Sequence, residues 1–128
     1  MTIQETVQRS HSVARSKGFW DKERNTGELL MLVTSELGEA LEADRKGRWA
    51  DPVDVTALEE SEKRTPSGDA EFKAKFEAHI KDTFQDEIAD AIIRLCDLCG
   101  GLDIDIGSHI ALKMRYNATR DRLNGKRY

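Results

Sequence analysis

Apolar residues recur every three or four positions over most of the chain, which is the spacing of one face of an α-helix. The clearest run contains Leu29, Leu30, Leu32, Val33, Leu37, Ala40 and Leu41. Asn25 precedes this run as a candidate N-cap, and Glu28 follows at the position of a capping-box glutamate. Gly47 is a suitable C-terminal stop. The pattern therefore predicts an amphipathic helix over 26–46.

Two further helical patterns flank this one. Residues 2–17 carry a sparse helical spacing of apolar side chains, and residues 83–99 carry a broad apolar face. Gly100 and Gly101 are expected to end the second of these helices, because glycine is a poor helix former.

Residues 50–68 differ in character from the rest. Pro52, Pro66 and Gly68 punctuate a strongly charged stretch, which predicts a long loop or insertion with room for one short helix. Asp69 then offers a cap for a helix that carries Phe72, Phe76 and Ile80.

A last helix is predicted over 103–122, with Asp103 or Asp105 at its positive N-terminal end, where the helix dipole favours an acid. No alternation typical of strands competes with these patterns. The expected fold is all-α: an antiparallel bundle of about four main helices. We expect a single domain over 1–128, with an insertion at 50–80.

Composition narrows the partners. The chain has 128 residues, 20 Lys plus Arg and 24 Asp plus Glu, for a net charge of −4. This argues against a sequence-blind binder of nucleic acid polymers, which is usually basic. Neither a signal-like N-terminal run nor a stretch of ~18 apolar residues is present, so no membrane partner and a cytoplasmic location are expected. Two cysteines do not make a disulfide scaffold.

The candidate chemistry lies in two acid pairs. Glu36 and Glu39 are three residues apart in the predicted helix 26–46, and Glu87 and Asp90 repeat that spacing in the helix 83–99. Residues at this spacing share a helix face. Two such helices packed side by side would bring four carboxylates together.

Four converging carboxylates repel one another, so they need protonation or a divalent cation. An all-oxygen set of this charge suits Mg²⁺, with Mn²⁺ as an alternative. No histidine follows any of these acids at the third position, and the three histidines are not spaced to join them. The alternative is that such pairs simply lie on solvated helix faces, as many acid pairs do.

The C-terminal segment from Leu112 onward is basic, with six cations and one acid. A basic helix facing an acidic metal pocket is suited to binding a polyphosphate. The alternative is that these cations only stabilise the C-terminal end of the helix dipole.

Three segments together resemble the MazG-like all-α nucleoside triphosphate pyrophosphohydrolases. They are Ser35-Glu36-Leu37-Gly38-Glu39-Ala40-Leu41-Glu42-Ala43, then Asp86-Glu87-Ile88-Ala89-Asp90-Ala91-Ile92-Ile93-Arg94, and then Lys113-Met114-Arg115-Tyr116-Asn117-Ala118-Thr119-Arg120 with Gly125-Lys126-Arg127. The resemblance covers about residues 26–48 and 83–128. In the family, however, the connection between the acid motifs is usually shorter than here.

The resemblance implies Mg²⁺-dependent cleavage of a nucleoside triphosphate between its α and β phosphates, by a homodimer or homotetramer. The products would be a nucleoside monophosphate and pyrophosphate. It implies that the metal ligands are Glu36, Glu39, Glu87 and Asp90. It also implies phosphate or sugar contacts from Lys113, Asn117 and Arg120, with Lys126 as a weaker candidate.

Several roles remain open from the sequence. Glu39 is our choice of general base among the four acids. Trp49 and Trp20 lie near the ends of the helix 26–46, where either could stack on a base or anchor a loop. Asp97 could support the metal ligands or cap a neighbouring helix, and Cys96 and Cys99 read as two buried thiols.

Two other functions are compatible with the sequence. One is a related hydrolase acting on another phosphoanhydride, such as phosphoribosyl-ATP. The other is a helical interaction or regulatory domain with a vestigial acidic site.

Overall fold

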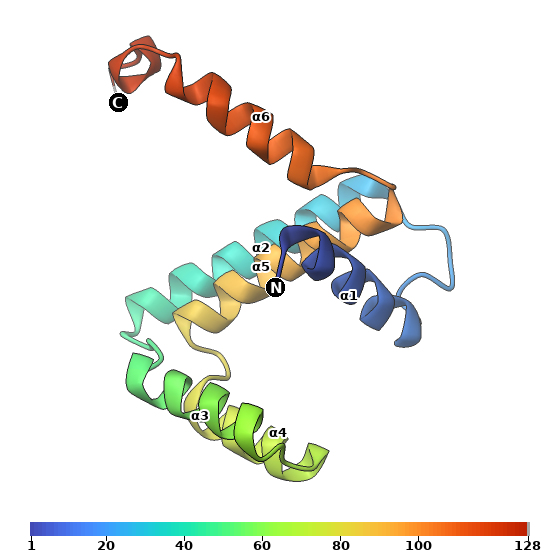
Figure 1. The fold of residues 1–128 in the computed structure, drawn as a ribbon, viewed down its shortest axis with the longest axis vertical. Helices are drawn as coiled ribbons and strands as arrows, with labels where there is room; N and C mark the ends of the chain where they lie inside the picture. Colours follow the sequence, from blue (N-terminus) through green and yellow to red (C-terminus); the bar gives the residue numbers. More distant parts are fainter. Residues whose placement is uncertain (128) are drawn as a thin grey trace. The chain divides into compact units, whose positions relative to one another are not determined.

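The computed structural model describes residues 1–127, which form six α-helices, one short 3-10 helix and no strand (Figure 1). The helices are α1 (Ile3–Ser16), α2 (Thr26–Arg45), α3 (Pro52–Arg64), α4 (Asp69–His79), α5 (Phe84–Gly101), α6 (Ile106–Ala118) and the 3-10 helix η1 (Arg122–Gly125). The predicted all-α class is confirmed, with six helices where about four were expected. None of the helices described is long and apolar enough to cross a membrane.

The chain divides into two compact units. One unit comprises residues 1–23 and the chain from residue 95 onward, and the other comprises Arg24–Arg94. Helix α5 therefore contributes its first part to the second unit and its last part to the first.

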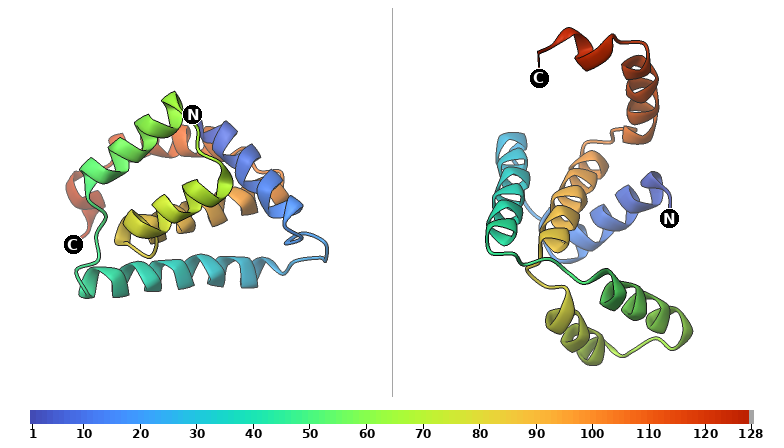
Figure 2. Two further views of the ribbon diagram at one scale, coloured as in Figure 1. Left: turned by 90° about the horizontal axis from the view of Figure 1, so that it is seen from below. Right: turned by 90° about the vertical axis from the view of Figure 1, so that its left-hand side faces the viewer.

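In the second unit, α2 and the start of α5 run side by side in opposite directions (Figures 1 and 2). Helix α2 begins as predicted, because the Asn25 side chain accepts a hydrogen bond from the backbone N–H of Glu28 at 3.2 Å. It ends one residue before its predicted end, and Gly47 follows with a left-handed φ of 67°. The buried residues of α2 recur every three or four positions: Leu29, Val33, Glu36, Ala40 and Ala43. Glu36 thus occupies a core position of this helix.

The segment predicted as a long loop is largely helical. Pro52 lies in the first turn of α3, where proline costs nothing because its missing N–H would have no partner in the helix. The Asp51 side chain caps this helix by accepting from the N–H of Val53 at 2.9 Å. Helix α4 follows, with Gly68 rather than Asp69 as its N-cap. Pro52 therefore marks the start of a helix, and Pro66 lies in the short connection between α3 and α4.

The base of this helical hairpin is tied together by residues 48–50 and the start of α5. The Phe84 N–H donates to the carbonyl of Arg48 at 2.8 Å. The Gln85 side chain accepts from the N–H of Ala50 at 2.8 Å and donates to its carbonyl at 3.1 Å. The Trp49 and Phe84 rings stack with centroids 4.3 Å apart. These contacts join the end of α2 to the start of α5 directly, whatever the intervening hairpin does.

In the first unit, Val7 of α1 packs with Cys96 and Cys99 of α5, and Ile106 of α6 lies against them. Helix α5 ends at Gly101, so the two glycines predicted to end it are its last two residues.

The two glycines at the end of α5 also leave space for other segments. A Cβ on Gly100 would meet the His11 side chain, and a Cβ on Gly101 would overlap the ring of Trp20. Close packing of other segments therefore explains why this helix contains two glycines.

Helix α6 is shorter than predicted. Asp105, one of the two predicted candidates, is its N-cap and accepts from the N–H of Ser108 at 3.1 Å. The other candidate, Asp103, lies in the preceding turn with a left-handed φ of 54°. The helix ends at Ala118 with Thr119 as C-cap, four residues before the predicted end.

We expect Gln85→Ala to lower the free energy of unfolding by about 1–3 kcal/mol, because it leaves the buried N–H of Ala50 without its partner. Urea denaturation is the measurement. Gln4→Ala is the matched control, since Gln4 is likewise the second residue of a helix but is exposed. Equal stability of the two variants would contradict the role given to Gln85.

Candidate functional site

Three of the four predicted acids meet within the second unit. Glu36 and Glu39 of α2 and Glu87 of α5 each place a carboxylate oxygen within 4.8 Å of the others. The fourth, Asp90, is not part of this triad. Asp90 still interacts electrostatically with the triad. Burial is the largest cause that raises the pKa of Asp90, and the negative charges of Asp86 and Glu36 raise it further.

Two members of this carboxylate triad are in the core of the unit. Glu36 and Glu87 are each 7% exposed, whereas Glu39 is exposed. The small residues Ala40 and Ala91 are buried one turn beyond Glu36 and Glu87. Burying two carboxylates side by side is unfavourable unless their charge is offset. Burying these two carboxylates therefore lowers the stability of the fold relative to an apolar core.

Arg94 offsets the charge of Glu36. Its Nε donates to Glu36 Oε1 at 2.6 Å. Burial of Glu36 raises its pKa, but the Arg94 hydrogen bond, a hydrogen bond with Glu39 and the Arg94 charge together outweigh burial and lower it. Glu36 is thus held ionised.

Glu87 is affected in the opposite direction. Burial raises its pKa, and the hydrogen bond and negative charge of Glu39 and then Glu36 raise it further, to about 7. The neighbouring carboxylates favour the protonated form because it removes a like charge and supplies a donor. A bound cation would offset the same repulsion.

Sequence reasoning missed the role of Arg94. The signal was present, because Arg94 follows Asp90 by four residues and Glu87 by seven, so that all three share a face of α5. A cation on the same helix face as two predicted metal ligands indicates a counter-charge for those acids.

A second group of acids shares Glu87. Asp82, Asp86 and Glu87 also place oxygens within 4.8 Å of one another. The backbone N–H of Asp82 donates to Asp86 Oδ2 at 2.9 Å. Asp82 is exposed and Asp86 is half-buried. Solvent therefore screens the repulsion between these two charges, and the fold can hold this group of acids without a bound ion.

The predicted phosphate-contacting residues belong to the first unit. Lys113 and Asn117, four residues apart, share a face of α6. Arg120 lies beyond the C-cap Thr119, and Lys126 follows η1 and is exposed. Lys113 and Arg120 both lie against the Tyr116 ring, with Nζ 4.8 Å and Cζ 5.7 Å from its centroid. Both cations therefore contact the same aromatic ring.

Each tryptophan has a defined partner. Trp49 stacks on Phe84, donates from Nε1 to Asp44 Oδ1 at 2.9 Å and remains 54% exposed. These contacts hold the Trp49 side chain between the end of α2 and the start of α5, and its exposed part stays a candidate for base stacking.

Trp20 donates from Nε1 to Asp97 Oδ1 at 2.8 Å, and His11 Nδ1 lies 2.9 Å from the same oxygen. The His11 and Trp20 rings meet edge to face at 5.1 Å. Asp97 is thus a partner for two side chains of its own unit, and neither of these two contacts is with a predicted metal ligand or caps a helix. Neither partner was apparent from the sequence, because both lie more than seventy residues away.

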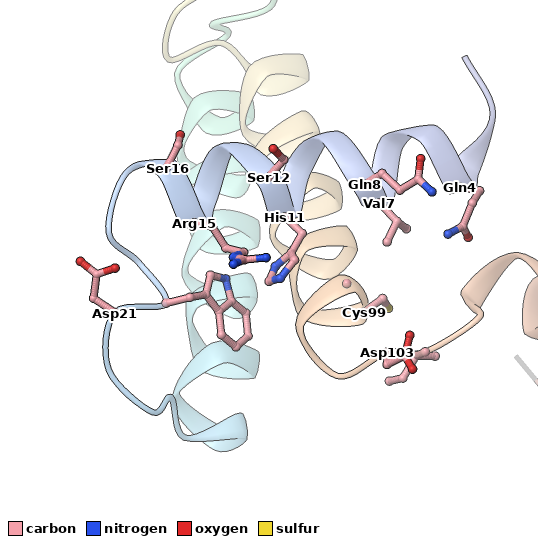
Figure 3. Close-up of a pocket in the computed structure, with 13 residues that line it drawn as sticks. Gln4, Val7, Gln8, His11, Ser12, Arg15, Ser16, Asp21, Cys99 and Asp103 are labelled. Atoms are coloured by element: carbon pink, nitrogen blue, oxygen red, sulfur yellow. The ribbon is translucent and has the colours of Figure 1, made fainter.

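A pocket of about 790 Å³ lies in the first unit. Its lining includes His11, Arg15, Trp20, Cys99 and Asp103, and Figure 3 shows the α1 side chains on its wall. Of the residues described, those that line it include none of the four predicted metal ligands. The pocket and the carboxylate triad therefore share no residue.

No protein-family model, curated protein or solved structure matches this chain. The resemblance to MazG-like enzymes stays a prediction carried by the motif residues alone.

We expect the metal-free protein to lose stability as the pH rises from about 4.5 to about 7. Glu87 has a raised pKa, so the folded state favours its protonated form, and this contribution is complete below 4.5 and lost through about 7. Melting temperatures in EDTA should fall by several degrees over this interval. Glu87→Gln, which mimics the protonated acid, should flatten the profile, and a wild-type slope in that variant would contradict the assignment.

Proposed function

We propose that this chain is a Mg²⁺-dependent nucleoside triphosphate pyrophosphohydrolase of the MazG-like kind. It cleaves the bond between the α and β phosphates to give a nucleoside monophosphate and pyrophosphate. The observation that carries the proposal is the convergence of Glu36, Glu39 and Glu87 from two antiparallel helices.

The donor set fits a hard divalent cation. All three triad members offer oxygen, and Asp90 lies within electrostatic reach as a fourth candidate. The repulsion that raises the pKa of Glu87 would be relieved by a cation. In this proposal Glu36, Glu39, Glu87 and Asp90 hold Mg²⁺, with Mn²⁺ as a substitute.

Phosphoanhydride cleavage depends on positioning and charge stabilisation more than on covalent chemistry. When bound, Mg²⁺ supplies positive charge to the phosphate oxygens. Glu39 is the exposed member of the carboxylate triad. Its exposure supports our assignment of Glu39 as the general base, which would accept a proton from an attacking water.

The remaining roles follow from the resemblance. Lys113, Asn117 and Arg120 contact the phosphates or sugar, with Lys126 as an additional contact. The contact of both Lys113 and Arg120 with the Tyr116 ring supports a shared role, because a polyphosphate is bound by several cations.

Trp49 is the preferred stacking surface for the base, since half of its side chain remains exposed, and Trp20 is the second candidate.

The proposal includes a homodimer or homotetramer. Leu30, Leu37 and Leu41 are 48%, 50% and 57% exposed, and their spacing puts them on one face of α2. An apolar stripe of this kind is unfavourable in water and is typical of a helix that is covered by another subunit.

The direct test is a panel of NTPs and dNTPs incubated with the purified protein in Mg²⁺ or in EDTA, followed by separation of the products. The expected products, formed only with Mg²⁺, are monophosphate and pyrophosphate. Diphosphate with inorganic phosphate would mean cleavage of the other bond and would overturn the proposal.

Glu39→Gln should abolish turnover, with a loss of at least a hundredfold, while the melting temperature in EDTA is unchanged or raised. The amide keeps the side chain's size but removes a negative charge and the proton acceptor. Glu42→Gln is the matched control, because Glu42 is three residues further along α2 and pairs with Lys46. Similar activity in the two variants would remove Glu39 from the mechanism.

A further inference from the structure

The carboxylate triad contains its own cation. Arg94 donates from Nε to Glu36 Oε1 at 2.6 Å, which is a short charge-assisted bond. The bond engages one oxygen of a carboxylate that is almost fully buried. The Arg94 guanidinium therefore already neutralises part of the negative charge on Glu36 that would attract Mg²⁺.

The position of Arg94 makes it a competitor for this charge. It shares the α5 face that carries Glu87 and Asp90. Its guanidinium bonds to Glu36 and acts electrostatically on Asp90, which are two of the acids proposed to bind metal. A divalent cation on Glu36 would be close to this guanidinium, and two cations at that distance repel each other.

Arg94 also has room to leave. Its side chain is 37% exposed, whereas that of Glu36 is 9% exposed. The guanidinium can therefore regain water as its long side chain moves, while Glu36 is fixed in the core. Of the two partners, Arg94 is therefore the one that can move away and break the bond.

We propose that Arg94 is the internal counter-cation of the metal-free site, and that it competes with the divalent cation for Glu36. This inference rests on the proposed metal site and adds how that site is charge-balanced when no metal is bound. Arg94 stabilises the metal-free fold and lowers the affinity for metal, because binding must displace its bond to Glu36.

The alternative is that Arg94 orients Glu36 as a metal ligand and keeps its bond when metal binds, as hydrogen-bond partners of metal ligands commonly do. The two roles predict opposite changes when the bond is removed. A competitor's removal strengthens metal binding, whereas an orienting partner's removal weakens it.

The test measures Mn²⁺ affinity by calorimetry, without nucleotide, in the wild-type protein and in Arg94→Gln. Competition predicts that Arg94→Gln binds Mn²⁺ about five- to fiftyfold more tightly. It also predicts a lower melting temperature in EDTA, and a smaller deficit at saturating Mn²⁺, because the metal then replaces the guanidinium.

Lys46→Gln is the matched control for loss of a positive charge at a distance. Lys46 is an exposed cation at the end of α2 and pairs with Glu42 at 3.2 Å. We expect its Mn²⁺ affinity to stay within about twofold of wild type, because exposed charges are screened. An equal gain in both variants would mean a general charge effect and would overturn the proposal.

The wild-type protein gives a second measurement that needs no variant. The Nε–H of Arg94 should be protected from exchange with water in EDTA, and NMR should show that protection lost on addition of Mg²⁺. Arg94→Lys identifies the signal.

The outcomes separate this inference from the proposed function. Mn²⁺ binding that is unchanged or weaker in Arg94→Gln, or an Nε–H that stays protected in Mg²⁺, overturns the competition and leaves the metal site standing. Absence of Mn²⁺ binding in the wild-type protein and in the variant overturns both.

Discussion

The second unit depends on how it tolerates like charges in its core. Two antiparallel helices bring together three carboxylates, of which Glu36 and Glu87 are buried. A pair of leucines at these positions would stabilise the packing without any penalty. The chain instead offsets the charge in two different ways, with a guanidinium on Glu36 and a tendency toward protonation on Glu87. The arrangement makes physical sense if its purpose is to bind a cation.

The rest of the unit maintains the register of these two helices. Capping by Asn25 fixes the start of α2, and the contacts of Trp49 and Gln85 join its end to the start of α5. This direct tie allows the α3–α4 hairpin to be inserted between the acid motifs without disturbing them. A long connection also costs little extra free energy to close. The long separation of the two motifs in this chain is therefore no obstacle to their convergence.

The sequence was informative where local rules decide the outcome. The helical period and the cap at Asn25 gave α2 almost to the residue, and the shared spacing of the acid pairs gave the meeting of Glu36, Glu39 and Glu87. The prediction was wrong where a residue has two local meanings, as with Pro52, which begins a helix. The glycine pair does end α5, but the sequence could not show that these positions must also be small because His11 and Trp20 pack against them. The pairing of Asp97 with Trp20 and His11 depends on the same long-range contacts, which spacing along the chain cannot reveal.

The central claim is that the carboxylate triad is a divalent-cation site, and anomalous diffraction from crystals grown with Mn²⁺ tests it most directly. The account predicts an anomalous peak between α2 and the start of α5, within about 2.5 Å of carboxylate oxygens of Glu36, Glu39 and Glu87. Asp90 is expected to join the coordination or to lie next to it. A peak elsewhere, or none at a Mn²⁺ concentration that saturates binding in solution, would contradict the account.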